Sequence, residues 1–242
     1  MNQHSPENWS ADKRIAAVKR IFGTIAPHYD LLNHLLSGGQ DIRWRNRTVK
    51  RLPADTRLVL DIACGTGDLS LAVAKRRPET KVIGLDFVRS MLDLARIKTD
   101  RAGLVSRVHH TAGDAMHLPF ANHRFDAAMV AFGFRNMPDR ARALAEMRRV
   151  VKSGGKVLVL EMTLPRGMRM RRFFVWYLNT IIPRLGGLIS GNREAYQYLP
   201  DSIAGFLKPE ELSNLFEGAG LREIRAFPLT YGIAYLHEGL VP

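Results

Sequence analysis

The ten residues VLDIACGTGD, at positions 59–68, carry the pattern that decides the fold. An apolar run leads directly into a loop with two glycines, Gly65 and Gly67, and an amphipathic helical stretch follows at 68–76. In open α/β sheets the first strand-to-helix turn is rich in glycine, because the backbone there approaches a bound ligand closely. The stretch therefore predicts a ligand site at the carboxyl end of a parallel strand.

The glycine spacing differs from that of the common phosphate-binding loops. A dinucleotide fingerprint needs a third glycine where this chain has Ser70, and the G-K-[ST] ending of a P-loop is absent. The loop instead lies between two acids, Asp61 and Asp68, which would repel a pyrophosphate in a partly desolvated cleft. We therefore expect a nucleoside that carries positive charge, namely S-adenosylmethionine with its sulfonium and amino groups.

Two further acids end the next two apolar runs. Asp86 lies about twenty residues beyond Gly65, where a carboxylate can bind ribose hydroxyls. Asp114 ends the following run, where its carboxylate and the adjacent backbone can meet an adenine amino group. A single Asp at such a place is also typical of a helix N-cap or a turn. Acids at three consecutive strand ends, Asp61 included, favour a ligand site.

The rest of the chain predicts a doubly wound α/β fold. Five short β-rich runs alternate with helical stretches at 68–76, 89–101 and 138–152, which is typical of βαβ units with a mostly parallel sheet. A helix near 209–219 and two closing runs complete a seven-stranded sheet. The strand runs are RLVLDIA (57–63), KVIGLDF (81–87), VHHTAGD (108–114), FDAAMVAFG (125–133), KVLVLEM (156–162), REIRAFPLT (222–230) and GIAYLHEG (232–239).

Composition narrows the class of protein. A chain of 242 residues with 46% hydrophobic and 24% charged residues can bury a full core as one domain. The single cysteine, Cys64, excludes an intramolecular disulfide and favours a small buried side chain in a reducing compartment. No signal-peptide or membrane-spanning run is present, so we expect a cytoplasmic protein. The histidines lack a recognised metal-ligand spacing, and we assign no metal.

Three blocks resemble the ubiquinone and menaquinone biosynthesis C-methyltransferases, often called the UbiE/MenG type. Together they extend the similarity from about residue 20 to residue 239, which is nearly the whole chain. The blocks are YDLLNHLLSGGQDIRW (29–44), FGFRNMPDRARALAEMRRVVKSGGKVLVLEMT (132–163) and the C-terminal YQYLPDSI…LTYGIAYLHEG. The resemblance implies a class I S-adenosylmethionine-dependent methyltransferase that methylates a ring carbon of a reduced polyprenyl quinone. Demethylmenaquinol is the first choice of acceptor, and the ubiquinone precursor 2-polyprenyl-6-methoxy-1,4-benzoquinol is the second.

The resemblance also assigns residues to the cofactor. It implies that Thr66, Asp86, Asp114 and Ala115 contact S-adenosylmethionine, in agreement with the glycine loop of Gly65 and Gly67. Three positions depart from the family pattern: Asp41 stands where His is usual, Leu32 where Met is usual, and Ala131 where some members have Ser.

For the chemistry, we expect Arg135 to stabilise the phenolate that forms on the acceptor, with Asn136 beside it as a hydrogen-bonding partner. A salt bridge from Arg135 to Asp139 or another surface acid is the alternative. Asp41 is a candidate catalytic residue. The candidates for a proton acceptor are His28, Asp41, Tyr196 and Tyr198, and the sequence does not choose among them.

Two further segments of the chain are predicted to have roles of their own, one ahead of the core and one inserted in it. Residues 1–50 are predicted to form an N-terminal cap, with 1–10 frayed and with two short helices broken at Gly23 and Pro27. In this cap Tyr29 and its neighbours are expected to close over the cofactor and exclude water. In the core, 51–242, an insertion at 166–190 interleaves arginines with aromatic residues and contains no acid. We expect this insertion to bind the inner, anionic face of a membrane peripherally.

The formal net charge of +13 leaves other partners open. An RNA methyltransferase would also be basic, but the chain has no added RNA-binding segment, so nucleic acid is not expected. A non-catalytic scaffold subunit is a further alternative, against which the intact glycine loop argues. A homo-oligomer or a complex with quinone-biosynthesis enzymes also stays open.

Overall fold

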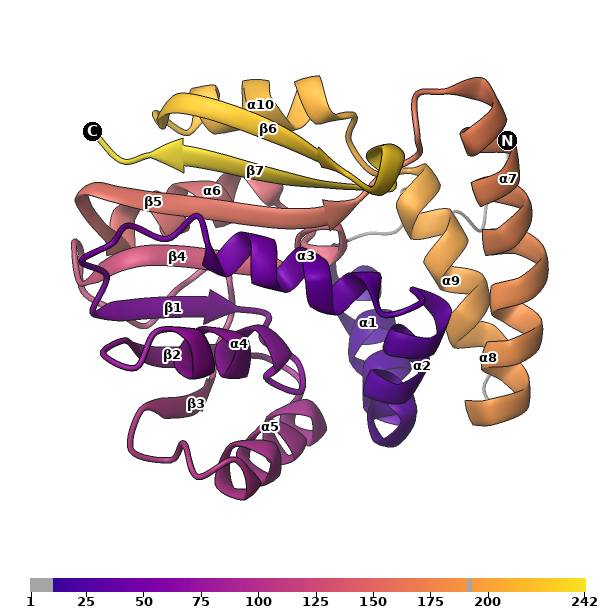
Figure 1. The fold of residues 1–242 in the computed structure, drawn as a ribbon, viewed down its shortest axis with the longest axis horizontal. Coiled ribbons are helices and arrows are strands. Elements are labelled where there is room, and N and C mark those ends of the chain that lie inside the picture. The colour runs from indigo at the N-terminus through magenta and orange to yellow at the C-terminus, as the bar shows by residue number, and fades with distance from the viewer. Residues whose placement is uncertain (1–10, 191–192) are drawn as a thin grey trace.

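A computed structural model describes residues 11–190 and 193–242, so the predicted frayed segment 1–10 lies outside the described residues. The seven predicted strands form one sheet in the order β3-β2-β1-β4-β5-β7-β6 (Figure 1). Strands β1 to β5 are parallel, and β7 pairs antiparallel with both β5 and β6, as expected for a closing pair. The strands are β1 Leu58–Ile62, β2 Lys81–Asp86, β3 Val108–Ala112, β4 Phe125–Ala131, β5 Val151–Met162, β6 Arg222–Leu229 and β7 Ala234–Leu240.

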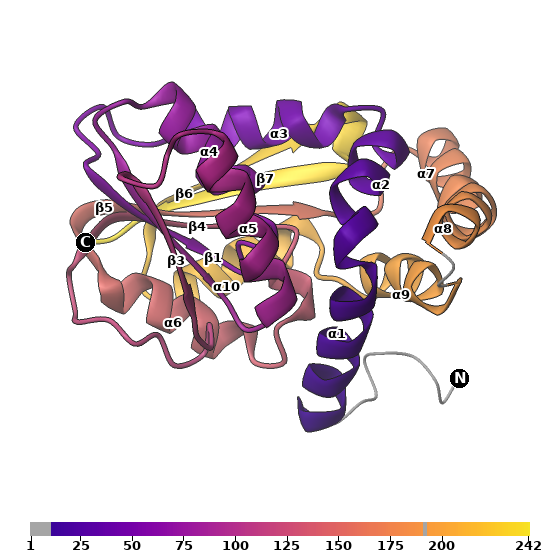
Figure 2. The same cartoon turned by 90° about the horizontal axis from the view of Figure 1, so that it is seen from below.

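Helices cover both faces of the sheet, as Figure 2 shows. Strand residues alternate between the faces: Leu60 and Ile62 pack toward α6 and α10, whereas Val59 packs toward α3 and α4. Both predicted helices next to the glycine loop and after β2 have the expected bounds. The layer helices are α3 Gln40–Val49, α4 Asp68–Arg76, α5 Arg89–Arg101, α6 Arg140–Val150 and α10 Pro209–Gly218.

A group of helices lies beyond the carboxyl ends of the parallel strands, and we call it the helical cap (Figure 1). Apolar residues of α1 and α2 pack there against α7 to α9, as in the contact of Leu32 with the cluster of Phe174 and Ile203. The cap consists of α1 Ala11–Ile25, the 3₁₀ turn Ala26–His28, α2 Tyr29–Leu36, α7 Met168–Trp176, the π-helical turn Tyr177–Ile181, α8 Ile182–Ser190 and α9 Arg193–Ala204.

Two features of the N-terminal segment differ from the sequence prediction. Helix α1 continues through Gly23, so only Pro27 interrupts the segment. A glycine inside a helix costs only about 1 kcal/mol, and the packing of Val18 and Ile21 outweighs that cost. Helix α3 lies within the predicted 1–50 cap, but its Trp44 and Val49 pack in the sheet core. Of the segment predicted as a cap, α1 and α2 with the turn between them therefore belong to the helical cap, and α3 belongs to the sheet layer.

The predicted insertion at 166–190 is helical and extends into the packing of α9. Within residues 11–190 and 193–242, no helix combines the length and the apolar character needed to cross a bilayer.

Candidate functional site

Three adjoining cavities open between the carboxyl ends of the strands and the helical cap. We call the largest, about 370 Å³, the apolar cavity, and the two smaller ones, about 140 and 50 Å³, the loop cavities. Both loop cavities are lined by Ala63 and Asp86. The smaller loop cavity shares Phe22, Tyr29 and Phe132 with the apolar cavity. Two ligands could therefore meet at this shared wall.

The glycine loop gains its shape from backbone conformations that most residues avoid. Gly67 has φ of 86° as the N-cap of α4, and a Cβ there would lie 3.2 Å from the Cβ of Ala95. A Cβ on Gly133, in the loop after β4, would lie 2.6 Å from the Cβ of Ala63. Glycine at these two positions therefore allows the glycine loop to pack closely against α5 and against the loop after β4.

Asp86 holds the glycine loop in place and lines both loop cavities. Its carboxylate accepts the Gly65 N–H and the Val88 N–H, each at 2.8 Å. Burial raises the pKa of Asp86, although these two donors act in the opposite direction. As predicted, Asp86 lies at the end of β2, where it borders the loop cavities.

Asp114 and Ala115 line the larger loop cavity, at the end of β3. The Asp114 carboxylate accepts the Met116 N–H at 2.9 Å, and its side chain remains 47% exposed. The acid therefore has a role in the local turn, and its other oxygen, Oδ2, lies 3.5 Å from Nδ1 of the exposed His117.

Three predicted cofactor residues do not line any of these three cavities. Thr66 is buried and donates its hydroxyl to Asp30 at 2.5 Å, and Gly67 shapes the turn. Asp61 is buried beneath the loop, where Ser70 donates to it at 2.6 Å, and burial raises its pKa to about 7. In this geometry Asp61 supports the loop from below, and Thr66, within the loop, links it to α2 through Asp30.

The charge of Asp68 is compensated within the protein, which changes the electrostatic argument drawn from the sequence. Lys98 donates to Asp68 and to Asp30, each at 2.5 Å. Because Lys98 neutralises Asp68 and because the pKa of Asp61 is raised, the two acids flanking the loop add less negative potential than their positions indicate. The acids on the loop-cavity walls are Asp86 and Asp114.

Arg135 lies on the wall of the apolar cavity and forms a buried ion pair. Its Nη1 donates to Glu161 Oε1 at 2.6 Å and to the Phe132 carbonyl at 2.7 Å, and its Nε donates to Ser202 at 3.3 Å. Burial acts to lower the pKa of Arg135, but the neighbouring Glu161 carboxylate outweighs it and the pKa is raised. Arg135 therefore stays charged in a mostly apolar setting.

The alternative prediction, a salt bridge from Arg135 to Asp139, is wrong. Asp139 caps α6 by accepting the Arg142 N–H at 2.9 Å. Glu161 was missed by sequence reasoning as a partner, although it ends a strand run in the same way as Asp86. The rule that selected Asp86 and Asp114 would have found it.

Asn136 and Tyr29 connect the cavities. Asn136 lines both loop cavities, and its Oδ1 accepts the hydroxyl of Tyr198 at 2.9 Å, which itself lines the apolar cavity. Tyr29, from α2, lines the smaller loop cavity and the apolar cavity, and burial raises the pKa of its phenol. Both residues therefore lie at the junction between the loop cavities and the apolar cavity.

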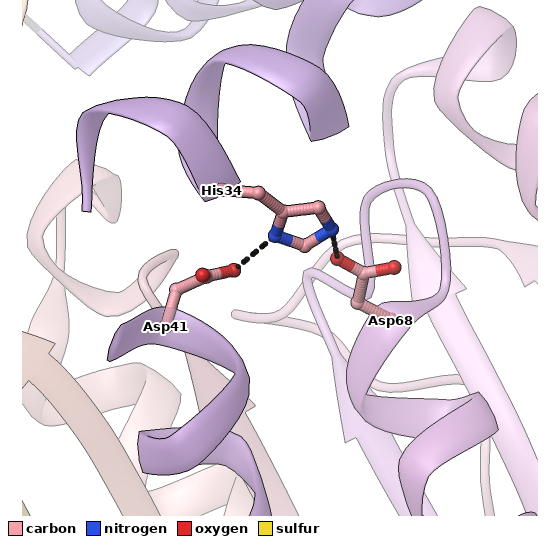
Figure 3. Close-up of side chains that lie close together, drawn as sticks. All are labelled: His34, Asp41 and Asp68. Carbon is pink, nitrogen blue, oxygen red and sulfur yellow. Dashed lines mark hydrogen bonds and ion pairs between the residues drawn. The ribbon is translucent and has the colours of Figure 1, made fainter. Parts of the chain in front are cut away.

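Asp41 lies on another wall of the apolar cavity. Its carboxylate accepts Arg45 Nη1 at 2.5 Å and Ser37 Oγ at 2.8 Å, and it lies 2.8 Å from His34 Nδ1 (Figure 3). Burial acts to raise the pKa of Asp41, but Arg45 and the hydrogen bonds outweigh it and the pKa is lowered.

The other proton-acceptor candidates separate clearly. Tyr198 is buried on the wall of the apolar cavity. His28 is exposed and lines none of the three cavities. The side chain of Tyr196 lies outside the described residues. Cys64 is buried, as expected, and burial raises its pKa well above the usual value.

The strand order, the glycine loop after β1 and the acids at the ends of β2 and β3 define a class I methyltransferase fold. Residues 9–241 match the ubiE/COQ5 methyltransferase family. The chain therefore belongs to this family, and it is a methyltransferase that uses S-adenosylmethionine.

Individual relatives support this assignment. The demethylmenaquinone methyltransferase of Thermus thermophilus is 44% identical over 90% of this chain and 99% of that relative. The ubiquinone/menaquinone biosynthesis C-methyltransferase UbiE of Citrifermentans bemidjiense is 39% identical over 92% of this chain and 95% of that relative. A solved S-adenosylmethionine-dependent methyltransferase from Thermotoga maritima shares the fold, with a TM-score of 0.64 at 22% identity over 92% of this chain and 99% of that one.

Proposed function

We propose that this protein methylates a ring carbon of a reduced polyprenyl quinone precursor, with demethylmenaquinol as the acceptor. The observation that carries the proposal is the apolar cavity, which adjoins the loop cavities and contains a buried Arg135–Glu161 ion pair on its wall. The mostly apolar wall suits the apolar ring and tail of such an acceptor, and the Arg135 guanidinium suits a phenolate on the ring. The relatives named demethylmenaquinone methyltransferase, at 44% and 43% identity, favour that acceptor.

We infer that S-adenosylmethionine binds in the loop cavities, where it supplies the methyl group. Asp86 and Asp114 offer carboxylate oxygens there, and Ala115 and the Gly65 backbone complete the walls. Tyr29 and Phe132 separate this region from the acceptor. These aromatic side chains orient the ring and exclude water from the transfer.

Arg135 has the position needed to favour the phenolate form of the acceptor. Its guanidinium lies on the cavity wall and stays charged at any physiological pH. Glu161 fixes its orientation from below, since it also accepts the Arg135 N–H at 3.0 Å. A preorganised cation of this kind stabilises negative charge on a ring oxygen without reorganisation during the reaction.

We also propose that the cavity mouth faces a membrane. Leu35 and Phe173 line the apolar cavity and are 54% and 57% exposed, and Trp176 beside Phe173 is 52% exposed. Exposed Arg169, Arg171 and Arg172 share helix α7 with these aromatics. Apolar side chains at the mouth and arginines around them suit an anionic lipid surface, which is where a polyprenyl tail resides. We therefore propose that the protein binds peripherally to the inner face of the membrane.

The acceptor is tested by methyl transfer from isotope-labelled S-adenosylmethionine. Purified protein is incubated with chemically reduced demethylmenaquinone, with reduced 2-polyprenyl-6-methoxy-1,4-benzoquinone and with bulk RNA. We expect label on a ring carbon of the first acceptor. Label only on the ubiquinone precursor would show that this precursor, and not demethylmenaquinol, is the acceptor. Label on RNA would favour the RNA methyltransferase, and cofactor binding without any transfer would favour a scaffold subunit.

The membrane proposal is tested by flotation with vesicles of phosphatidylcholine, with and without phosphatidylglycerol. We expect binding that needs the anionic lipid and is lost when Phe173 and Trp176 are changed to Ser. The matched control changes Ile97 and Val105 to Ser, because these residues are similarly exposed, at 46% and 54%, but lie on or after α5. If the protein bound equally well to vesicles without phosphatidylglycerol, the proposed contact of the arginines with anionic lipid would be wrong.

A further inference from the structure

Methylation of a quinol releases one proton, and the site must remove it. The acceptor O–H bond breaks and leaves its electron pair on oxygen. The ring carbon then bonds the methyl group as the C–S bond breaks with its electron pair going to sulfur, and the ring C–H proton moves to the ring oxygen. The net products are a methylated quinol, S-adenosylhomocysteine and one proton. This question rests on the proposed function.

Among the described residues that line the apolar cavity, Asp41 is the one acid. The other titratable groups there are Arg45, Arg135 and three tyrosines, Tyr29, Tyr177 and Tyr198. The arginines cannot accept a proton at neutral pH, and burial raises the pKa of Tyr29 and of Tyr177. Asp41 is therefore the carboxylate that an acceptor hydroxyl can reach.

Asp41 is connected to a partly exposed imidazole. Figure 3 shows the His34 ring between two carboxylates, with Nδ1 at 2.8 Å from Asp41 Oδ2 and Nε2 at 3.8 Å from Asp68 Oδ2. Asp41 is almost fully buried, whereas the His34 side chain is 36% exposed. The pair therefore extends from the cavity wall to the solvent.

We propose that Asp41 and His34 form a proton outlet, in which Asp41 accepts the acceptor's hydroxyl proton and His34 carries it from the cavity to water. Asp41 Oδ1 accepts one bond from Ser37 and keeps a second acceptor site for the hydroxyl. In the tautomer that carries its proton on Nε2, His34 Nδ1 takes the proton from Asp41 and Nε2 releases its own proton to solvent. The ring then holds its proton on Nδ1 and returns to the first tautomer by proton exchange with water at its exposed edge. Asp41 is then a catalytic residue and His34 a positioning and relay residue.

The same three residues do not favour a metal ion. His34, Asp41 and Asp68 lie close enough to share one, but cationic side chains already occupy the carboxylates. Arg45 donates to Asp41 at 2.5 Å and lies 3.8 Å from Asp68, while Lys98 donates to Asp68 at 2.5 Å. A divalent ion would have to displace a guanidinium and an ammonium.

The imidazole has a physical reason to be there. Arg45 lowers the pKa of Asp41, so the carboxylate alone would return the proton at once. An imidazole can accept a proton at one ring nitrogen and release one from the other, so it can pass the proton on. The charged groups that face His34 are Asp41 and Asp68 directly, with Arg45 and Lys98 behind them.

This arrangement also accounts for a departure in the sequence. The family signature that this chain resembles usually has His where Asp41 stands. In this chain the imidazole beside that position comes from His34, seven residues earlier. An imidazole is thus kept at the edge of the cavity.

The experiment measures single-turnover methyl transfer to reduced demethylmenaquinone against pH. His34→Gln keeps a hydrogen-bonding side chain but cannot carry a proton, and we expect its rate to fall roughly 100-fold, with a pH profile that differs from that of the wild type. The affinity for S-adenosylmethionine should change by less than about twofold. Added imidazoles should rescue His34→Ala in the order of their pKa values. His109→Gln, an exposed edge-strand histidine, is the control.

The outcomes separate the outlet from the proposed function. Failure of the wild-type protein to methylate the quinol would overturn both. Wild-type activity with an unchanged rate in His34→Gln would overturn the outlet alone. A slower His34→Gln with the wild-type pH profile and no rescue of His34→Ala would also overturn it, because a structural role alone gives that result.

Discussion

The loop cavities and the apolar cavity are built in different ways. Around the loop cavities, short segments after β1 to β4 supply much of the wall together with residues of α1, and the carboxylate of Asp86 is held by backbone N–H groups. Around the apolar cavity, side chains from α2, α3, α7, α9 and the loop after β4 converge, and ion pairs such as Arg135–Glu161 fix them. The difference teaches that a local backbone motif makes a large part of the proposed cofactor side, whereas long-range side-chain contacts make the proposed acceptor side.

The largest expected effect tests whether the acceptor side depends on its buried ion pair. Glu161→Ala leaves the Arg135 charge buried without a partner, and we expect a loss of about 3–5 kcal/mol in the free energy of unfolding. Urea denaturation measures it. The control is Glu79→Ala, which breaks an exposed pair with Arg57 and should cost less than about 1 kcal/mol. Equal losses in the two variants would contradict the comparison.

The second prediction separates the charge of Arg135 from its structural role. The double variant Arg135→Gln, Glu161→Gln removes both charges and keeps a polar pair in place. We expect single-turnover methyl transfer to fall by roughly 10²–10³-fold, since a preorganised donor of this kind is worth about that much. Calorimetry should show S-adenosylmethionine affinity within about threefold of the wild type. A matching loss of cofactor affinity would mean that the pair supports the whole site.

The third prediction concerns the dry region beneath the glycine loop. His110 lies there, with Nε2 at 2.9 Å from Thr99 Oγ1, and burial lowers its pKa to about 4. The unfolded chain, with a pKa near 6.5, binds the proton more readily between pH 6.5 and 4. Stability should therefore fall as the pH decreases through this window, by up to about 3 kcal/mol.

Chemical denaturation at pH 7, 5.5 and 4.5 measures this loss. His110→Gln cannot titrate, so its stability should depend less on pH than that of the wild type over the same window. Parallel curves for the two proteins would show that His110 is solvated and that the region beneath the loop is wet.

The smallest expected effect tests the exposed edge of the cofactor side. Asp114→Asn removes a charge that is already 47% exposed, so we expect a loss of about 1 kcal/mol, or roughly fivefold, in S-adenosylmethionine affinity. Calorimetry measures it. Asp93→Asn is the control, since Asp93 is an exposed acid paired with Arg96, and it should leave the affinity unchanged. If both variants lost affinity equally, the effect would come from the overall charge of the protein and not from a contact of Asp114 with the cofactor.

The parts of the fold with a strong local pattern could be predicted from the sequence. The bounds of α4 and α5 agree with prediction, and the seven strands fall where the apolar runs do. The break at Gly23 was wrong, because cap packing outweighs the weak helix preference of glycine. Helix α3 was not predicted, since its sequence is mostly polar and only tertiary contacts of Trp44 and Val49 hold it on the sheet.

The sequence by itself determined the cofactor side. A glycine loop and acids at successive strand ends meet at one sheet edge in any parallel α/β fold, because parallel strands bring their carboxyl ends together. It also singled out Arg135, which lies on the wall of the apolar cavity. Only the tertiary structure decided which charged side chains near the cavities are paired with a partner. Glu161 pairs with Arg135, Lys98 with Asp68, and His34 with Asp41. These pairs join elements whose contact depends on packing of the whole domain, and no local spacing encodes such contacts.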